Sequence, residues 1–292
     1  MIFDGKKMRD EVLVELTVKV AKMEHKPTLA VFLIGGDPVS AKYDDIKKKF
    51  TEKIGAHFCL YKFDEKDSEQ EIIAAIEFLN ADPETDGVMI QIPIPKKFNR
   101  DKLIAKISPA KDVDGLRFCA GLDSKFQPPV VLAILEALKI AESRIKNYEL
   151  RDLKITLAGH GFLVGAPLAR SLRENGSNPL VILNEVKNLK TQRSFADAQD
   201  DIKRADIIIS ATGSPNLIKP EMVKDGVVLI DAGTSEENGE LRGDIDPECY
   251  GKASYYTPVP GGIGPVTVAM LLRNLTQKSE IRISKSETNS KK

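Results

Sequence analysis

The chain changes from an apolar strand to an amphipathic helix at Gly36–Lys47, which reads GDPVSAKYDDIK. Asp37 is a good N-cap residue, and Pro38 suits the first helical position because its missing N–H is not needed there. Apolar side chains then recur at helical spacing and predict one buried stripe: Val39, Tyr43, Ile46, Phe50 and Ile54. We therefore expect a strand, a turn and a helix here.

Ser40, Tyr43 and Lys47 lie three and four residues apart, along one edge of this stripe. An aromatic ring and an ammonium one turn apart, beside a buried face, are suited to hold a flat substrate and to move protons. Lys47 also begins the run Lys47–Lys49, and such runs are usually solvated helix faces without chemistry. This stretch alone leaves both interpretations open.

The composition favours a two-domain protein that acts on small molecules. A chain of 292 residues is long enough for two domains with separate cores. Its 43 basic and 43 acidic side chains cancel, which argues against nucleic acid or an anionic membrane as a partner. No apolar run approaches the ~20 residues of a membrane span, and the N-terminus lacks the apolar core of a signal peptide, so we expect a cytoplasmic protein.

Cysteine and histidine are too dispersed to indicate a metal site. The three cysteines, Cys59, Cys119 and Cys249, form no C-x-x-C pair, which predicts reduced thiols. The three histidines are also far apart in the sequence. We therefore expect a mechanism without a metal.

Strand and helix patterns alternate along the chain, which is typical of an α/β fold with parallel sheets covered on both faces. Strands are predicted at 28–34, 57–63, 87–92, 153–158, 180–183, 207–211 and 227–230, and helices at 6–25, 68–80, 102–107, 129–141, 164–175 and 265–275. We place the domain boundary in a polar segment, so that the domains cover 1–145 and 146–263. The polar end, 277–292, is predicted to be a disordered tail.

In such sheets, ligands collect beyond the carboxyl ends of the strands. Tyr43 and Lys47 follow the first strand, and Gln91 ends the third, where Pro93 must stop the hydrogen-bond ladder. The segment Lys111–Gly115, KDVDG, follows a short helix and by itself also fits an ordinary turn.

In the second half, Gly159–Gly165, GHGFLVG, joins a strand to a helix. This is the context in which a helix N-terminus binds a dinucleotide pyrophosphate, although the spacing differs by one from G-x-G-x-x-G. The later strands end near Gly or Asp, so we predict a small doubly wound nucleotide-binding fold.

Four segments in this order resemble the bifunctional methylenetetrahydrofolate dehydrogenase/methenyltetrahydrofolate cyclohydrolase family: Gly36–Lys47, Asp86–Pro95, Lys111–Gly115 and Pro258–Thr267. The resemblance implies an α/β folate-binding catalytic domain and a Rossmann-like doubly wound nucleotide-binding domain, with helix 264–276 packed back on the first. It further implies tetrahydrofolate derivatives as substrates, NADP as cofactor, both activities of the family, and a homodimer.

The resemblance also assigns roles to residues. Tyr43 would stack on the folate ring system, Lys47 would be the catalytic lysine, and Gln91 would position it. Asp114 would hydrogen-bond the pterin. The loop residues Pro258, Gly261 and Gly262 would close over the substrate, although such a loop also fits a tight connection. The implied cofactor-binding residues are Gly159, His160, Gly161, Val164, Gly165, Ala211, Thr212, Gly213 and Thr267.

The chain departs from the family pattern near the folate, where a hydroxyl is lost at Val130–Val131, and near the cofactor. Val130–Val131 replace a usual Thr-Pro pair, and His160–Gly161 replace Arg-Ser. Asn184–Glu185, after the second strand of the nucleotide fold, favours a free ribose hydroxyl over a 2′-phosphate. The cations Lys187, Lys190 and Arg193 follow in a long connection and oppose that effect. We expect a weakened preference for NADP, with NAD competitive.

Two other functions remain open. The first is a folate- or nucleotide-binding protein whose altered turn no longer holds a cofactor productively. The other alternative is a different two-domain NAD(P)-dependent dehydrogenase, such as a shikimate-type enzyme. Gln91–Pro93 and the Pro258 loop speak against the second alternative.

Overall fold

A computed structural model describes residues 1–35, 38–143, 149–182, 195–237 and 239–289, without the side chains of 38–43, 195–198 and 280–289. The chain forms two compact units. The three-stranded unit contains Arg9–Pro129 and Val268–Lys292, and the five-stranded unit contains Met1–Met8 and Val130–Thr267. The units therefore divide at 129/130, whereas the sequence suggests 145/146, and two terminal helices belong partly to each.

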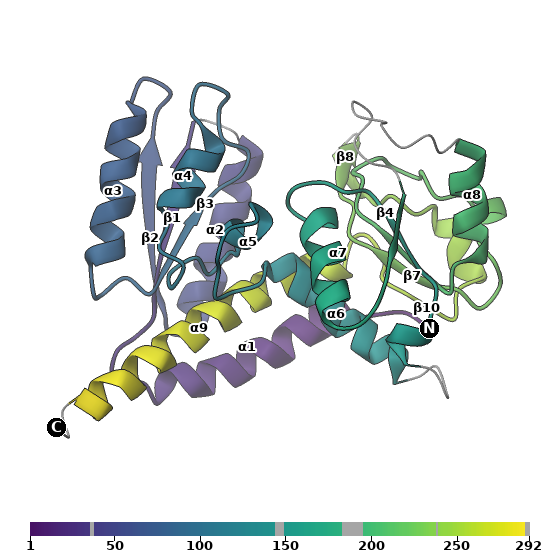
Figure 1. Ribbon diagram of the computed structural model, residues 1–292. Helices are drawn as coiled ribbons and strands as arrows, with labels where there is room; N and C mark the ends of the chain where they lie inside the picture. Colours follow the sequence, from purple (N-terminus) through teal and green to yellow (C-terminus); the bar gives the residue numbers. More distant parts are fainter. Residues whose placement is uncertain (36–37, 144–148, 183–194, 238, 290–292) are drawn as a thin grey trace. The chain divides into compact units, whose positions relative to one another are not determined.

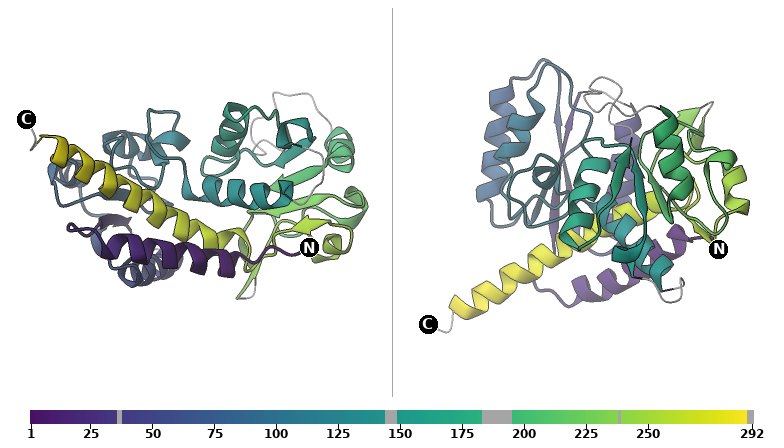
Figure 2. Two further views of the ribbon diagram at one scale, coloured as in Figure 1. Left: turned by 90° about the horizontal axis from the view of Figure 1, so that it is seen from below. Right: turned by 45° about the vertical axis from the view of Figure 1, so that its right-hand side comes forward.

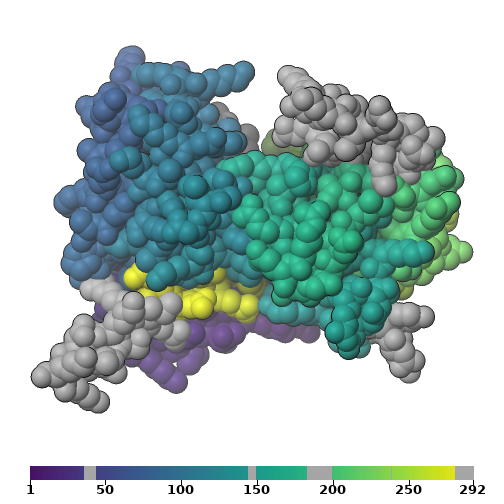
Figure 3. Space-filling model, in the orientation of Figure 1, coloured from purple at the N-terminus to yellow at the C-terminus, as the bar shows by residue number. Residues whose placement is uncertain are grey.

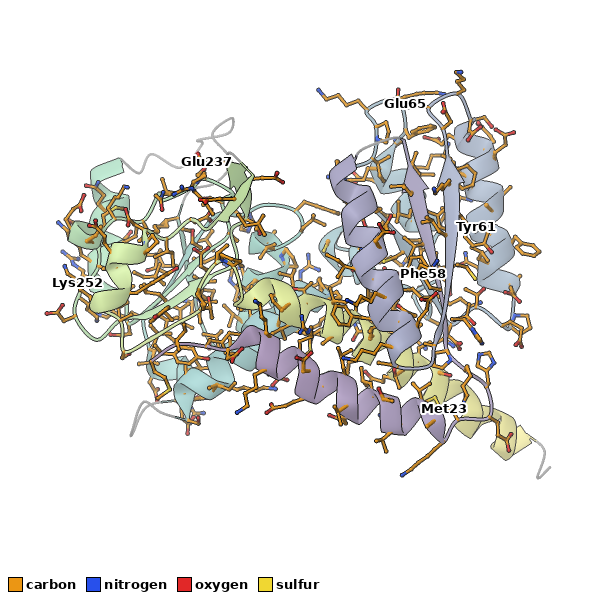
Figure 4. All side chains as sticks on the ribbon, turned by 180° about the vertical axis from the view of Figure 1, so that it is seen from behind. Met23, Phe58, Tyr61, Glu65, Glu237 and Lys252 are labelled. Carbon is orange, nitrogen blue, oxygen red and sulfur yellow. The ribbon has the colours of Figure 1, made fainter. Side chains whose placement is uncertain are left out.

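The three-stranded unit is built on β1 (Thr28–Ile34), β2 (His57–Phe63) and β3 (Gly87–Ile90), which are parallel in the order β2-β1-β3. The central strand β1 carries no charged side chain and is almost wholly buried, as its apolar run predicts. The edge strand β2 is half-buried and carries Phe58 and Tyr61 (Figure 4). Tyr61 stacks on Phe32 of β1, with ring centroids 5.5 Å apart.

Helices cover both faces of this sheet (Figure 1). The chain leaves β1 for one edge and returns past it to the other, so right-handed crossovers place α2 (Pro38–Lys53) and α3 (Glu69–Ala81) on opposite faces. The α3 helix begins with a capping box between Ser68 and Glu71. The short helices α4 (Arg100–Lys106) and α5 (Leu116–Cys119) follow β3.

The terminal helices α1 (Gly5–Ala21) and α9 (Ile263–Asn289) run toward the amino ends of the strands in this unit (Figures 1 and 2). Within the unit, α1 buries Leu13, Leu16 and Val20. The predicted disordered tail from 277 is wrong as far as Asn289, because α9 continues and Ser279 is buried. No Gly or Pro follows Pro265 to end the helix.

The five-stranded unit confirms the predicted doubly wound fold. Its strands are β4 (Ile155–Ala158), β5 (Leu180–Ile182), β6 (Ile207–Ser210), β7 (Val228–Asp231) and β10 (Tyr255–Tyr256). All pair in parallel, in the order β10-β7-β6-β4-β5. The strand order therefore reverses between β4 and β6, where doubly wound folds bind their ligands.

Helices α6 (Pro129–Glu142), α7 (Gly165–Glu174) and α8 (Phe195–Arg204) belong to this unit, and α7 lies on its surface in Figure 3. The hairpin of β8 (Ser235–Glu237) and β9 (Glu240–Arg242) was not predicted, because its short, largely exposed strands have no apolar alternation. In the described residues of both units, no helix is long and apolar enough to cross a membrane.

Candidate active site

Lys47 is held at the carboxyl end of the three-stranded sheet. Its side chain is only 12% exposed, whereas Lys48 and Lys49 are exposed. Its ammonium donates to Gln91 Oε1 and to Asp44 Oδ1, the latter at 3.2 Å. The lysine run thus contains one enclosed ammonium and two solvated ones. The interpretation as a chemical group fits Lys47, and the interpretation as a solvated helix face fits Lys48 and Lys49.

Gln91 is oriented by the residues around it. Its backbone N–H donates to Phe32 O of β1 at 2.8 Å, which extends the sheet by one residue. Its side-chain Nε2 donates to Ile92 O at 3.2 Å, which leaves Oε1 to accept from Lys47. The strand ends at Ile90, two residues earlier than predicted, and Pro93 follows. The expected meeting of Lys47 and Gln91 is therefore present in the structure.

The two carboxylates of the KDVDG segment differ in their surroundings. Asp112 is fully buried, accepts from the backbone N–H groups of Leu116 and Arg117 at 3.0 and 2.9 Å, and has a pKa raised to about 7 by burial. Asp114 lies close enough to Lys47 for the ammonium to oppose the increase in pKa that burial causes. The ordinary-turn interpretation therefore fits Asp112, whereas Asp114 is within the electrostatic influence of Lys47.

Two further residues of α2 complete this view. Tyr43 lies one turn before Lys47 on the helix, but its side chain is outside the described part of the structure. Asp44 was not singled out from the sequence, although a carboxylate three residues before a lysine on a helix is a recognisable signal. Its side chain is only 3% exposed.

The Pro258–Gly262 loop belongs to the five-stranded unit and forms a tight turn. Gly262 N–H donates to Pro258 O at 2.8 Å, and Gly261 O accepts from Gly5 N–H at 3.0 Å. Gly261 has a φ of +107°, and a Cβ at Gly262 would lie 2.5 Å from Pro258 O. This geometry fits the tight-connection interpretation, and the closing of Pro258, Gly261 and Gly262 over a substrate stays a prediction.

The glycine-rich turn lies at the point where the strand order reverses. Gly159 follows β4 with a φ of +100°, and a Cβ there would lie 2.5 Å from Ala211 O, which follows β6. A Cβ at Gly165 would collide with Gly159 O, whereas one at Gly161 would meet nothing within 4 Å. The turn is thus packed on the protein side and open at Gly161, as a loop that cradles a phosphate requires.

The start of α7 fits an anionic ligand. Val164 is its N-cap residue and makes no side-chain capping hydrogen bond. A helix N-terminus without a side-chain cap, beside an open glycine turn, suits a dinucleotide pyrophosphate. His160 and Gly161 occupy this turn, so neither supplies a fixed cation. The residues present therefore fit a nicotinamide dinucleotide.

The second cofactor loop, Ala211–Gly213, is fixed by a buried carboxylate. Asp244 Oδ2 accepts from Thr212 N–H at 2.6 Å and from Ser210 Oγ at 2.8 Å. The hydroxyl of Thr267 donates to Ile263 O at 3.2 Å. Cofactor contacts of these residues stay predictions. Asn184–Glu185 and the following cations lie outside the described residues.

Family comparisons now settle the membership of the chain. The catalytic-domain model of tetrahydrofolate dehydrogenase/cyclohydrolase matches residues 3–114, and the NAD(P)-binding-domain model matches 132–283. The chain belongs to the tetrahydrofolate dehydrogenase/cyclohydrolase family. This membership confirms the resemblance drawn from the sequence, and it does not favour a different two-domain dehydrogenase.

Individual relatives match over nearly the whole chain. The bifunctional protein FolD of Nautilia profundicola is 36% identical over 290 residues, which are 96% of this chain and 97% of that protein. The FolD crystal structure from Campylobacter jejuni has a TM-score of 0.86 and 33% identity, covering 97% and 99% of the two chains. The Trypanosoma brucei enzyme in complex with NADP and an inhibitor has a TM-score of 0.85 and 26% identity, covering 97% and 98%.

No cluster of metal-binding side chains accompanies this family fold within the described ranges. Among those residues, no three His, Cys, Asp or Glu side chains lie close enough together to hold an ion. Cys59, Cys119 and Cys249 are not joined by disulfide bonds.

Proposed function

We propose that this chain oxidises 5,10-methylenetetrahydrofolate to 5,10-methenyltetrahydrofolate with NADP, and then hydrolyses that product to 10-formyltetrahydrofolate. The observation that carries the proposal is the enclosed Lys47 ammonium, held by Gln91 where the strands of the three-stranded sheet end. It occurs in a chain that matches both domain models of the family.

The oxidation depends mainly on alignment. Bound NADP supplies the hydride acceptor, so the protein has to hold two ligands in a productive arrangement. In the five-stranded unit, Gly159, Gly161 and the start of α7 would hold the pyrophosphate. In the three-stranded unit, the Asp114 carboxylate would accept hydrogen bonds from the pterin and Tyr43 would stack on its ring.

The hydrolysis depends on proton transfer. The water oxygen bonds to the one-carbon bridge of the methenyl cation, and the bond from that carbon to N5 breaks with its electron pair going to N5. One proton of the water ends on N5, and the other leaves to solvent. In its neutral form, Lys47 would take the first proton from the water and return it to N5.

We further propose a homodimer in the cytoplasm. Family membership and the balanced net charge support self-association over a charged macromolecular partner. The scattered cysteines, which form no disulfide bond with one another, fit a reducing compartment. Sedimentation equilibrium of the purified chain tests the dimer, and a monomer at micromolar concentration would exclude it.

Absorbance of methenyltetrahydrofolate separates the proposed activities from simple ligand binding. With methylenetetrahydrofolate and NADP, we expect the methenyl product to form and then to decay faster than in a sample without enzyme. A folate- or nucleotide-binding protein without activity would bind substrate and produce no change. The same assay with NAD tests the cofactor.

A further inference from the structure

Asp44 is a buried carboxylate whose only hydrogen bond within the described residues goes to the catalytic candidate. It lies on α2 one turn before Lys47, is 3% exposed, and accepts from Lys47 Nζ at 3.2 Å through Oδ1. Its other oxygen, Oδ2, is buried and has no hydrogen-bond partner among those residues. Burying an ionised carboxylate is unfavourable unless it is paired.

Other buried carboxylates in this chain have an evident structural task. Asp112 holds two backbone N–H groups at the start of α5. Asp231 accepts from the N–H groups of Gly233, Asp244 and Ile245 and so holds the chain after β7. Asp44 holds no backbone group and caps no helix end in the described structure. Its placement is therefore explained by Lys47 and not by the fold.

Two acceptors fix the direction in which Lys47 can exchange a proton. An ammonium has three N–H donors, and Asp44 and Gln91 take two of them. When Lys47 loses a proton while keeping both partners, the lone pair occupies the third position. Asp44 and Gln91 together thus determine where the proton-exchanging position of Lys47 points.

Among the side chains that the structure describes, few other charges act on this pair. Asp44 is influenced by Lys47, which opposes the burial-induced increase in its pKa, and by Asp45, which adds to that increase. Asp114 also interacts electrostatically with Lys47. Strand β1, which packs on α2, has no titratable side chain, and Gln91 is neutral. Strand β2, which also packs on α2, carries His57, Cys59, Tyr61 and Lys62. Two carboxylates thus act on the Lys47 ammonium, and Asp44 is the one in direct contact with it.

We propose that Asp44 is a positioning residue for the hydrolytic reaction, which fixes the Lys47 amine and increases its proton affinity. The proposal rests on the function proposed above. Because hydride transfer moves no proton through Lys47, Asp44 should matter for hydrolysis and much less for oxidation. This difference distinguishes a positioning role from a general contribution to stability.

The test compares Asp44→Asn, which keeps an acceptor but removes the charge, with Asp44→Leu, which removes both. Asp45→Asn is the matched control, because Asp45 is the neighbouring exposed carboxylate. We expect Asp44→Asn to move the Lys47-dependent limb of the hydrolysis pH profile down by roughly one pH unit, with oxidation within about threefold of wild type. Asp44→Leu should reduce hydrolysis by about tenfold or more.

A second readout does not depend on activity. A ¹⁵N-lysine NMR titration, with Lys47→Met identifying the resonance, should show a lower Lys47 pKa in Asp44→Asn and an unchanged value in Asp45→Asn. The proposal is overturned if neither the profile nor the titration moves in Asp44→Asn, if Asp45→Asn shifts them equally, or if both activities fall by the same factor. Absence of both activities in the wild type would instead refute the proposed function.

Discussion

At the scale of single residues, one ammonium lies among more than one carboxylate. Lys47 contacts Asp44 and acts on Asp114, and burial raises the pKa of both acids. One cation cannot fully compensate the charges of two buried carboxylates. A ligand with N–H donors would therefore bind favourably beside Asp114. The pterin ring of the proposed substrate has such donors.

Replacement of Asp114 should therefore act on substrate affinity. We expect Asp114→Ala to weaken folate binding by ~1.5–3 kcal/mol, the size of lost hydrogen bonds to a charged group. The dissociation constant can be measured by titration calorimetry, with Asp123→Ala, an exposed carboxylate, as a control. An unchanged dissociation constant would show that Asp114 does not contact the substrate.

Asp231 gives a prediction about pH and stability. Burial and the neighbouring Asp244 raise its pKa from 3.8 to about 7, against the effect of three backbone N–H groups. Between pH 4 and pH 7 the folded chain thus retains a proton that the unfolded chain has released, so this residue's contribution to stability falls as pH rises and is constant above about 7.

Urea unfolding at pH 5 and pH 7.5 checks this sign. The stability advantage of wild type over Asp231→Asn should shrink by about 2 kcal/mol between these pH values, at roughly 1.4 kcal/mol per pKa unit. A constant difference would mean that Asp231 is ionised at both values.

At the scale of elements, sequence patterns were most accurate where burial and capping act locally. Strands 28–34 and 57–63 match β1 and β2 in full, and the Ser68 cap of α3 is present. The two-residue strand β10 was not predicted, because it exists only through its pairing with β7. Asp44 was likewise missed, since its burial depends on contacts that helical spacing does not show.

Two substitutions in the glycine turn after β4 should distinguish an effect on folding from an effect on cofactor binding. We expect Gly159→Ala to destabilise the five-stranded unit, because of its positive φ and the approach to Ala211 O. Gly161→Ala meets no protein atom within 4 Å and should keep the melting temperature while weakening cofactor binding. Equal melting temperatures for both variants would contradict the account of Gly159.

At the scale of the whole molecule, the alternation of strands and helices was enough to predict two α/β units and the doubly wound sheet. The assignment of the terminal helices to the units was not predictable, because α1 and α9 each contribute to both. Likewise, the length of α9 was not predicted. The polar composition after residue 276 suggested a disordered tail, whereas the helix meets no stop signal and Ser279 is buried.

Cofactor choice also belongs to this scale, since we expect it to depend on Glu185 and on the cations that follow it in the sequence, which lie outside the described residues. We expect kcat/KM with NAD to be competitive with that for NADP, because the Glu185 carboxylate would repel a 2′-phosphate. Both values should be measured on one preparation. An NADP preference above about a hundredfold, or ~2.7 kcal/mol, would show that Lys187, Lys190 or Arg193 restores the phosphate site.

The central claim is that Lys47 performs the proton transfer of hydrolysis in a site that otherwise aligns the substrate. Hydrolysis of methenyltetrahydrofolate by Lys47→Met, followed by absorbance, tests it most directly. We predict a loss of about a hundredfold or more, with folate still bound and oxidation of methylenetetrahydrofolate still measurable. Hydrolysis at the wild-type rate by this variant would contradict the account.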